Sequence, residues 1–176
     1  MTGGDPELAI DAYEQAALLA PEDPLVAVDL GAAYAAVGEL EAARLAFEYA
    51  TQLDPRDPSL WSLLAQFSLD YEVQLEEVGL PAAREAAKLL PSDAAALDRL
   101  GYTHYLLGNQ ILAERFIRDA IEVDGNLASA YYHRGLLALS SGDVGDGRWA
   151  LATAYALDPD GRYGNLALRS LENLSQ

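Results

Sequence analysis

Two histidines are the side chains in this sequence best suited to proton transfer or metal binding, and cysteine is absent. A metal or nucleophile site requires several converging ligands, or a carboxylate that orients the histidine. We find no obvious orienting carboxylate for His133, whose side chain we expect to be semi-exposed. We interpret His104 as a buried, hydrogen-bonded residue of the core. The sequence therefore predicts no catalytic residue, no metal ligand and no cofactor, and the protein is not expected to be an enzyme.

Residues 141–147, which read Ser-Gly-Asp-Val-Gly-Asp-Gly, have a composition similar to phosphate-binding and calcium-binding loops. A phosphate loop requires a Gly-Lys-Ser/Thr sequence, and this segment has no lysine. A calcium loop requires alternating Asp or Asn ligands and a glutamate at its twelfth position, and the spacing here does not fit. The repeat frame instead explains Gly142 as the inner turn between two helices and Gly147 as a close-contact position on the second helix. Gly145 has no such explanation and should loosen the start of that helix.

The net charge of −17 is distributed unevenly along the chain. Residues 1–80 contain 16 acidic and 2 basic side chains, whereas residues 81–176 contain 12 and 9. This surface would repel nucleic-acid phosphates, so nucleic acid is excluded as a partner. Two interpretations remain open: a basic partner is steered to the N-terminal half, or the charge only keeps the protein dispersed in solution.

Membrane insertion and export are not indicated by the sequence. No stretch approaches the ~20 apolar residues that a membrane span needs. Residues 1–4 lack the basic region and the apolar run of a targeting signal. We therefore expect a cytoplasmic location.

The helices that would carry any functional site recur at a fixed interval along the sequence. Pro21, Pro55, Pro91 and Pro159 are 34, 36 and 68 residues apart, and Gly125 divides the last interval into 34 and 34. A constant period of this size indicates stacked repeats. Large apolar residues recur at three- and four-residue spacing, which places them on one helix face. Small residues mark positions where two helices must approach closely: Gly31, Ala65, Gly101 and Gly135.

The first full repeat contains Ala27-x-x-Leu30-Gly31-x-x-Tyr34, followed by Ala43-x-x-x-Phe47, Ala50 and Pro55. This resembles the tetratricopeptide repeat pattern, and the later repeats agree with it in phase. The resemblance implies an all-α fold: an α-solenoid of antiparallel helix pairs that forms a right-handed superhelix as one domain over residues 1–176. Its parts would be a half repeat (5–21), four repeats (24–57, 58–93, 94–127 and 128–161) and a capping helix (162–174).

We expect helices at 6–20, 24–37, 40–53, 58–72, 80–90, 93–107, 110–123, 127–141, 144–157 and 162–174. The second repeat is two residues longer than the others, so its inner turn, at 71–79, should protrude. Glu72, Glu76 and Glu77 make this turn acidic. It is either a tolerated surface insertion or a point of contact with a partner.

In the tetratricopeptide repeat family, the first helix of each pair lines a concave groove in which peptides lie. The resemblance therefore implies these candidate peptide-binding residues: Val28, Ala32, Ser62, Gln66, Asp98, Tyr102, Tyr105, Tyr132 and Leu136. None is Lys, Arg or Asn, which the chaperone-binding members of the family use to clamp a carboxylate, so that role is not expected. Periodicity leaves open whether the tyrosines line the groove or pack against neighbouring repeats.

The expected function is a non-catalytic protein–protein interaction module that binds a peptide or protein segment with basic or amphipathic character. The alternative is self-association. The helix at 6–20 matches the second half of a repeat, whose first half would precede Met1. Either the chain is part of a longer protein, or another copy covers Ala9, Tyr13 and Ala16 in a homodimer.

Overall fold

A computed structural model describes residues 6–175 of the chain. Residues 1–4, where the sequence predicts no targeting signal, lie outside the described residues, as do Gln176 and Asp5, the predicted start of the half repeat. The described part has no β-strand, which confirms the all-α fold. Its elements are α1 (Pro6–Leu19), α2 (Pro24–Ala36), α3 (Leu40–Leu53), α4 (Pro58–Tyr71), η1 (Leu75–Gly79), α5 (Leu80–Leu89), α6 (Ala94–Leu106), α7 (Gln110–Val123), α8 (Ala128–Ser140), α9 (Val144–Leu157) and α10 (Arg162–Asn173). Each predicted helix is recovered to within one residue at either end.

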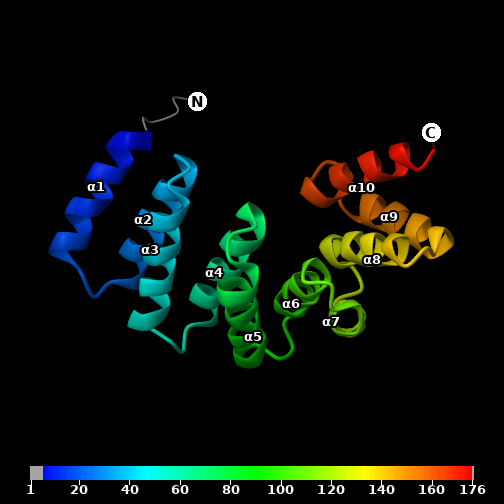
Figure 1. Ribbon diagram of the computed structural model, residues 1–176, viewed down its shortest axis with the longest axis horizontal. Helices are drawn as coiled ribbons and strands as arrows, with labels where there is room; N and C mark the ends of the chain where they lie inside the picture. The colour runs from blue at the N-terminus through cyan, green and yellow to red at the C-terminus, as the bar shows by residue number, and fades with distance from the viewer. Residues whose placement is uncertain (1–5, 176) are drawn as a thin grey trace. The chain divides into compact units, whose positions relative to one another are not determined.

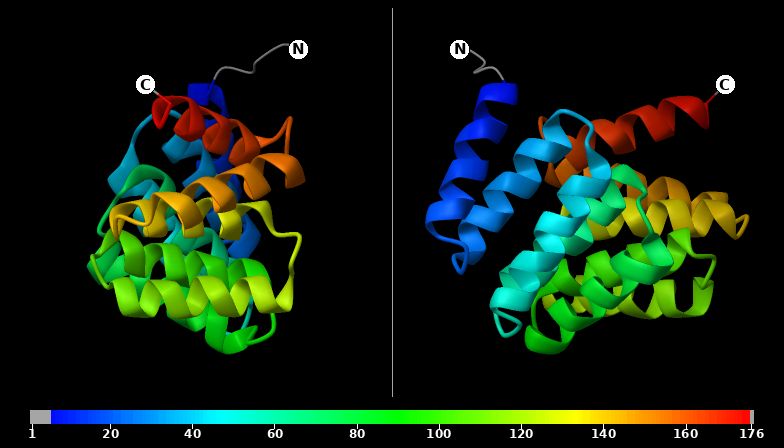
Figure 2. Two further views of the ribbon diagram at one scale, coloured as in Figure 1. Left: turned by 90° about the vertical axis from the view of Figure 1, so that its right-hand side faces the viewer. Right: turned by 60° about the vertical axis from the view of Figure 1, so that its left-hand side comes forward.

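The chain folds as two compact units, Met1–Leu89 and Leu90–Gln176, which we call the first and second unit. Within each unit, helices that follow one another in the sequence pack side by side (Figure 1). In the second unit α8 also contacts α6 and α10, so the first helices of successive repeats touch (Figure 2). The predicted single domain over residues 1–176 stays a prediction. None of the helices in residues 6–175 combines the length and the apolar character needed to cross a bilayer.

Aspartate side chains cap the N-termini of α2, α4 and α6. The carboxylates of Asp23, Asp57 and Asp93 accept hydrogen bonds from backbone amides in the first turns of α2, α4 and α6, at 2.9, 2.8 and 2.6 Å. Pro24 and Pro58 follow the first two of these caps, at a position where no helical amide is lost. Each cap contributes about 1 kcal/mol to its helix.

Small residues allow the two helices of a repeat to touch. A Cβ atom added to Gly31 would lie 3.1 Å from the Phe47 ring. One added to Gly101 would lie 2.8 Å from Cγ1 of Ile117 and 2.9 Å from its backbone nitrogen. The predicted close approaches in these two repeats are therefore confirmed, and the larger side chains of the second helices fill the remaining space.

The second repeat differs from the prediction at its inner turn. Glu72 and Gln74 have left-handed backbones, with φ of 52° and 45°, and the turn continues as the π-helical η1 rather than as an open loop. The wider turn of a π-helix absorbs extra residues without ending the helix. Glu72, Glu76 and Glu77 are exposed as expected, but Val78 is buried. Only part of the segment therefore protrudes.

Candidate functional site

The five predicted site residues of the second unit lie on two helices that contact each other, α6 and α8. Asp98, Tyr102 and Tyr105 follow helical spacing along α6, so their side chains share one face of that helix. Tyr132 and Leu136 are four residues apart on α8, the helix that contacts α6. Asp98 is buried, whereas the other four are half-buried.

A buried polar network lies at the centre of this group. Ser129 Oγ donates a hydrogen bond to Asp98 Oδ2 at 2.6 Å, and His133 Nδ1 lies 2.8 Å from Asp98 Oδ1. The exposed fractions of Asp98, Ser129 and His133 are 3%, 7% and 4%. Because a carboxylate only accepts hydrogen bonds, the Nδ1 proton of His133 is directed to Asp98. This bond fixes the orientation of the imidazole ring.

The expectation that His133 is semi-exposed and has no orienting carboxylate is wrong. Its partner, Asp98, precedes it by 35 residues, which is close to one repeat period. Residues one period apart occupy equivalent places on adjacent first helices, and α6 and α8 are in contact. A search for polar residues separated by one period, with a tolerance of one residue, would have found this pair. His104, by contrast, is 2% exposed and stacks against Phe116, which confirms its assignment to the core.

Three half-buried tyrosines, Tyr102, Tyr132 and Tyr163, pack against His133, and a fourth, Tyr105, stacks on Tyr102. We call these four residues the tyrosine cluster. The Tyr102 ring stacks on His133, with centroids 3.9 Å apart and planes inclined by 10°. Tyr105 extends the stack from Tyr102 at 5.9 Å, and Tyr163 meets His133 edge-on at 5.5 Å. Tyr132 lies 5.9 Å from Tyr163. The cluster is therefore a packed aromatic surface held around an oriented imidazole.

Two properties of the cluster were not predicted from the sequence. Tyr163 lies on α10, one period after Ser129, beyond the repeats to which groove positions were assigned. Burial raises the pKa of the Tyr132 phenol above its ordinary value of 10.0, and a hydrogen bond with Ser170 and the charge of Arg162 oppose this shift. At neutral pH the Tyr132 hydroxyl is therefore an uncharged hydrogen-bonding group.

The order of the polar network argues against acyl-transfer chemistry. In a serine hydrolase triad the histidine lies between the serine and the carboxylate, and it removes the serine proton. Here Asp98 lies in the middle, so the Ser129 hydroxyl donates to a carboxylate and not to His133. Among the described residues, no three His, Asp or Glu side chains gather as a metal site would require. The network does contact an aromatic side chain, since the Tyr102 ring stacks on His133.

The four predicted site residues of the first unit are dispersed over α2 and α4. Val28 is half-buried against a cluster formed by Ala27, Ala50 and Leu60. Ala32 is exposed, and Ser62 and Gln66 are half-buried. These four side chains are smaller than those of the tyrosine cluster, and none of them is aromatic.

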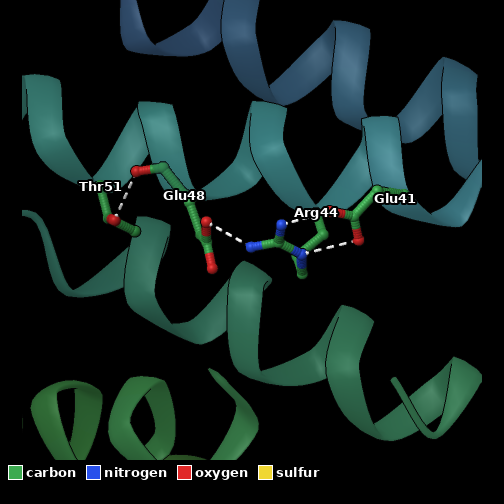
Figure 3. A network of polar contacts seen from close by, with 4 residues as sticks. All are labelled: Glu41, Arg44, Glu48 and Thr51. Carbon is green, nitrogen blue, oxygen red and sulfur yellow. Dashed lines mark hydrogen bonds and ion pairs between the residues drawn. The ribbon is translucent and has the colours of Figure 1, made fainter. Parts of the chain in front are cut away.

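Arg44, one of the two basic residues in 1–80, forms ion pairs with two glutamates of its own helix (Figure 3). Its guanidinium group donates to Glu41 at 2.5 and 3.0 Å and to Glu48 at 2.6 Å. Hydrogen bonds to Glu41 and Glu48 raise the pKa of Arg44 above its usual range. Because Arg44 is neutralised locally, the surface of α3 offers little positive charge to a partner.

Ser141, Gly142 and Asp143 form the expected inner turn, and α9 begins at Val144. Gly142 has a left-handed φ of 85°, and Asp143 caps α9 through the Asp146 amide at 2.9 Å. A Cβ atom added to Gly147 would lie 2.6 Å from a side-chain carbon of Leu139, so this glycine permits close packing. Gly142, Asp143 and Gly147 thus have structural roles in the turn, the helix cap and helix packing.

A tetratricopeptide repeat family model matches residues 1–67 of the chain. No curated protein matches the sequence of this chain. The solved structure of MamA 41-end from Desulfovibrio magneticus RS-1 is 20% identical, covers 90% of this chain and 89% of that chain, and superposes with a TM-score of 0.75.

Two further solved structures have the same fold. YrrB, a TPR protein with an unusual peptide-binding site, is 21% identical over 93% of this chain and 84% of its own, with a TM-score of 0.69. PilW, a widely conserved type IV pilus biogenesis factor, is 16% identical over 96% of this chain and 80% of its own, with a TM-score of 0.75. At such identities the likeness is one of fold. The tetratricopeptide repeat family model thus covers residues 1–67, and the described residues have the fold of these solved tetratricopeptide repeat structures.

Proposed function

We propose that the second unit binds a peptide or an extended protein segment on its tyrosine cluster, and that the protein acts as a non-catalytic interaction module. Protein–protein interaction is the general role that the tetratricopeptide repeat fold implies. The observation that carries the proposal is the packing of three half-buried tyrosines around one buried, oriented histidine, with a fourth tyrosine stacked on one of them. The peptide-binding site for which YrrB is described gives further support.

Tyrosine suits this role for two physical reasons. Its ring offers a large apolar contact area, and its hydroxyl group makes hydrogen bonds at the edge of that area. In addition, the side chain loses little rotational freedom when it binds, particularly where it is already packed. The stacking of Tyr102 on His133, and the hydrogen bond of His133 to Asp98, hold part of the surface in place before a ligand arrives.

The charge of the chain favours a partner with basic or amphipathic character and disfavours nucleic acid. Val28, Ala32, Ser62 and Gln66 are proposed as a second set of contact residues in the first unit. Asp98 acts as a positioning residue, because its buried carboxylate is occupied by Ser129 and His133. The cytoplasmic location expected from the sequence stays a prediction.

The test is a peptide-display selection on the wild-type protein, followed by measurement of the Kd of the recovered peptides by fluorescence polarisation. The double variant Tyr102→Ala/Tyr105→Ala should weaken binding by about tenfold to a hundredfold, because aromatic anchors dominate such interfaces. Tyr155→Ala is the matched control, since Tyr155 is an exposed tyrosine on α9, outside the cluster.

A thermal melt of each variant separates loss of binding from loss of folding. Tyr132→Phe, which keeps the ring and removes the hydroxyl, provides a second variant with a smaller structural effect. Peptides that bind the double variant as tightly as the wild-type protein would show that the cluster is not the binding surface.

Self-association is a second candidate, favoured by the exposure of α1. Ala43 and Phe47 on α3 are 0% and 6% exposed, but Ala9 and Tyr13, one period earlier, are half-buried. Leu18 and Leu19 are 83% and 88% exposed. A second copy of the chain would bury this apolar surface. Light scattering tests the idea: a concentration-dependent dimer that Leu18→Glu/Leu19→Glu abolishes would support it, and a monomer at all concentrations would exclude it.

A further inference from the structure

The second unit has another hollow, on the side of α8 that faces away from the tyrosine cluster. Its volume is about 460 Å³, and it lies between α7 and the pair formed by α8 and the start of α9. Successive helical residues are rotated by about 100°, so Arg134 and Leu137, which line the hollow, lie on a different side of α8 from Tyr132 and Leu136. We call this hollow the α7–α8 groove.

The floor of the groove is apolar. Ile117 and Leu137 are buried, and Ile121 is half-buried against them. Ile111, which also lines the groove, is 84% exposed at the start of α7. An isoleucine this exposed beside an apolar floor gives a partner a continuous apolar contact. The volume is within the ~300–1,000 Å³ range of ligand-binding pockets.

The wall of the groove carries an excess of negative charge. Four carboxylates and two guanidinium groups line it, which gives a net charge of −2: Glu114, Glu122, Asp143, Asp146, Arg118 and Arg134. Both guanidinium groups already face carboxylates, since Arg134 donates to Asp146 at 2.8 Å and Arg118 lies 3.8 Å from Glu122. Among the described residues Glu114 has no ion-pair partner. The groove therefore attracts cations.

We propose that the α7–α8 groove docks an amphipathic helix of a partner protein, which places aliphatic side chains on Ile111, Ile121 and Leu137 and lysine or arginine side chains near Glu114. The lining residues of α7 extend from Gln110 to Glu122, about 18 Å of helix, which matches about three turns of a docked helix. Laying the apolar face of a helix in an apolar groove is a common mode of recognition. This surface is separate from the tyrosine cluster, so the protein would hold two partners, or two segments of one.

The test uses a synthetic helical peptide of about 18 residues with leucines at i, i+3, i+4 and i+7 and flanking lysines, and a second peptide with glutamate at each lysine position. Affinities are measured by fluorescence polarisation on the full chain at low and high salt. The lysine peptide should bind and the glutamate peptide should not, and binding should weaken as salt screens the charges.

Ile111→Glu separates docking from general charge attraction. It adds a carboxylate, so an unspecific attraction of the lysine peptide to this acidic chain would become stronger. Docking should instead weaken by about tenfold, because an apolar contact is replaced by a charge. Leu45→Glu, at a leucine that is 54% exposed on α3, is the matched control and should leave binding unchanged or slightly tighter.

A charge-reversal pair completes the test. Glu114→Lys should weaken binding, whereas Glu172→Lys, at an exposed glutamate on α10, should change it by less than about threefold. The Tyr102→Ala/Tyr105→Ala variant should bind the lysine peptide as the wild-type protein does, so this result is independent of the proposed function. Three outcomes would each overturn the proposal: equal or tighter binding by Ile111→Glu, equal binding of the glutamate peptide, or an assembly that Ile111→Glu converts to monomer, which would make the occupant a second copy.

Discussion

Replacing Asp98 with alanine should destabilise the second unit strongly, although Asp98 is a single carboxylate. Its oxygens accept from Ser129 at 2.6 Å and from His133 at 2.8 Å, and all three side chains are buried. The variant would leave the Ser129 hydroxyl and the His133 imidazole buried without this acceptor. A buried polar group without a partner costs about 1–3 kcal/mol, so the expected loss in free energy of unfolding is about 2–5 kcal/mol.

Urea denaturation followed by far-UV circular dichroism measures this loss. Asp119→Ala is the matched control, because Asp119 is half-exposed and faces Arg115 and Arg118 at 3.7 and 3.5 Å. Exposed ion pairs of this kind contribute less than about 1 kcal/mol. If Asp98→Ala costs no more than Asp119→Ala, the buried network does not stabilise the fold and the reasoning is wrong.

A double-mutant cycle isolates the contact between Asp98 and His133. The single variants Asp98→Ala and His133→Ala and their combination should give a coupling free energy of about 1–3 kcal/mol, because the two side chains share one hydrogen bond. Additive effects would show that the two residues do not interact in solution, and the positioning role of Asp98 would then have to be abandoned.

Two further predictions concern packing and pH. Gly101→Ala should lower the free energy of unfolding by about 1–3 kcal/mol, because the new methyl group would meet Ile117 at 2.8 Å. Gly125→Ala, where the nearest atom would be 3.9 Å away, should leave stability unchanged, and thermal melts of the two variants test the difference. Burial holds the Tyr132 phenol protonated in the folded state, so above pH 10.0 the unfolded chain releases this proton first and stability falls as pH rises. Tyr132→Phe should reduce that fall in urea denaturation across alkaline pH, and an unchanged slope would contradict the assignment.

Helix positions could be predicted from the sequence because local chemistry determines them. Asp57 and Pro58 start α4, and Gly38, with a φ of 85°, follows the end of α2. Each of these signals acts over a few residues, so it can be read without knowing the tertiary fold. The period of the repeat then predicts which two helices pack together as a pair.

The features that were missed depend on contacts between elements or on fine backbone geometry. The partner of His133 is on another helix, and periodicity could not separate a buried Asp98 from one lining a groove. Nothing in the composition of residues 71–79 distinguishes a π-helical turn from a loop, since both accept two extra residues. The α7–α8 groove is formed by three elements together, so no single motif indicates it.

The division into two compact units has a practical consequence for spectroscopy. The chain has two tryptophans, and each unit contains one of them, Trp61 in the first and Trp149 in the second. Trp61 Nε1 donates to the Pro55 carbonyl at 3.0 Å, whereas the Trp149 ring lies 4.8 Å from the Arg134 guanidinium carbon, so the two indoles have different surroundings. Variants that keep one tryptophan at a time would let fluorescence report on each half of the molecule separately, and would reveal whether the halves melt as one or in succession.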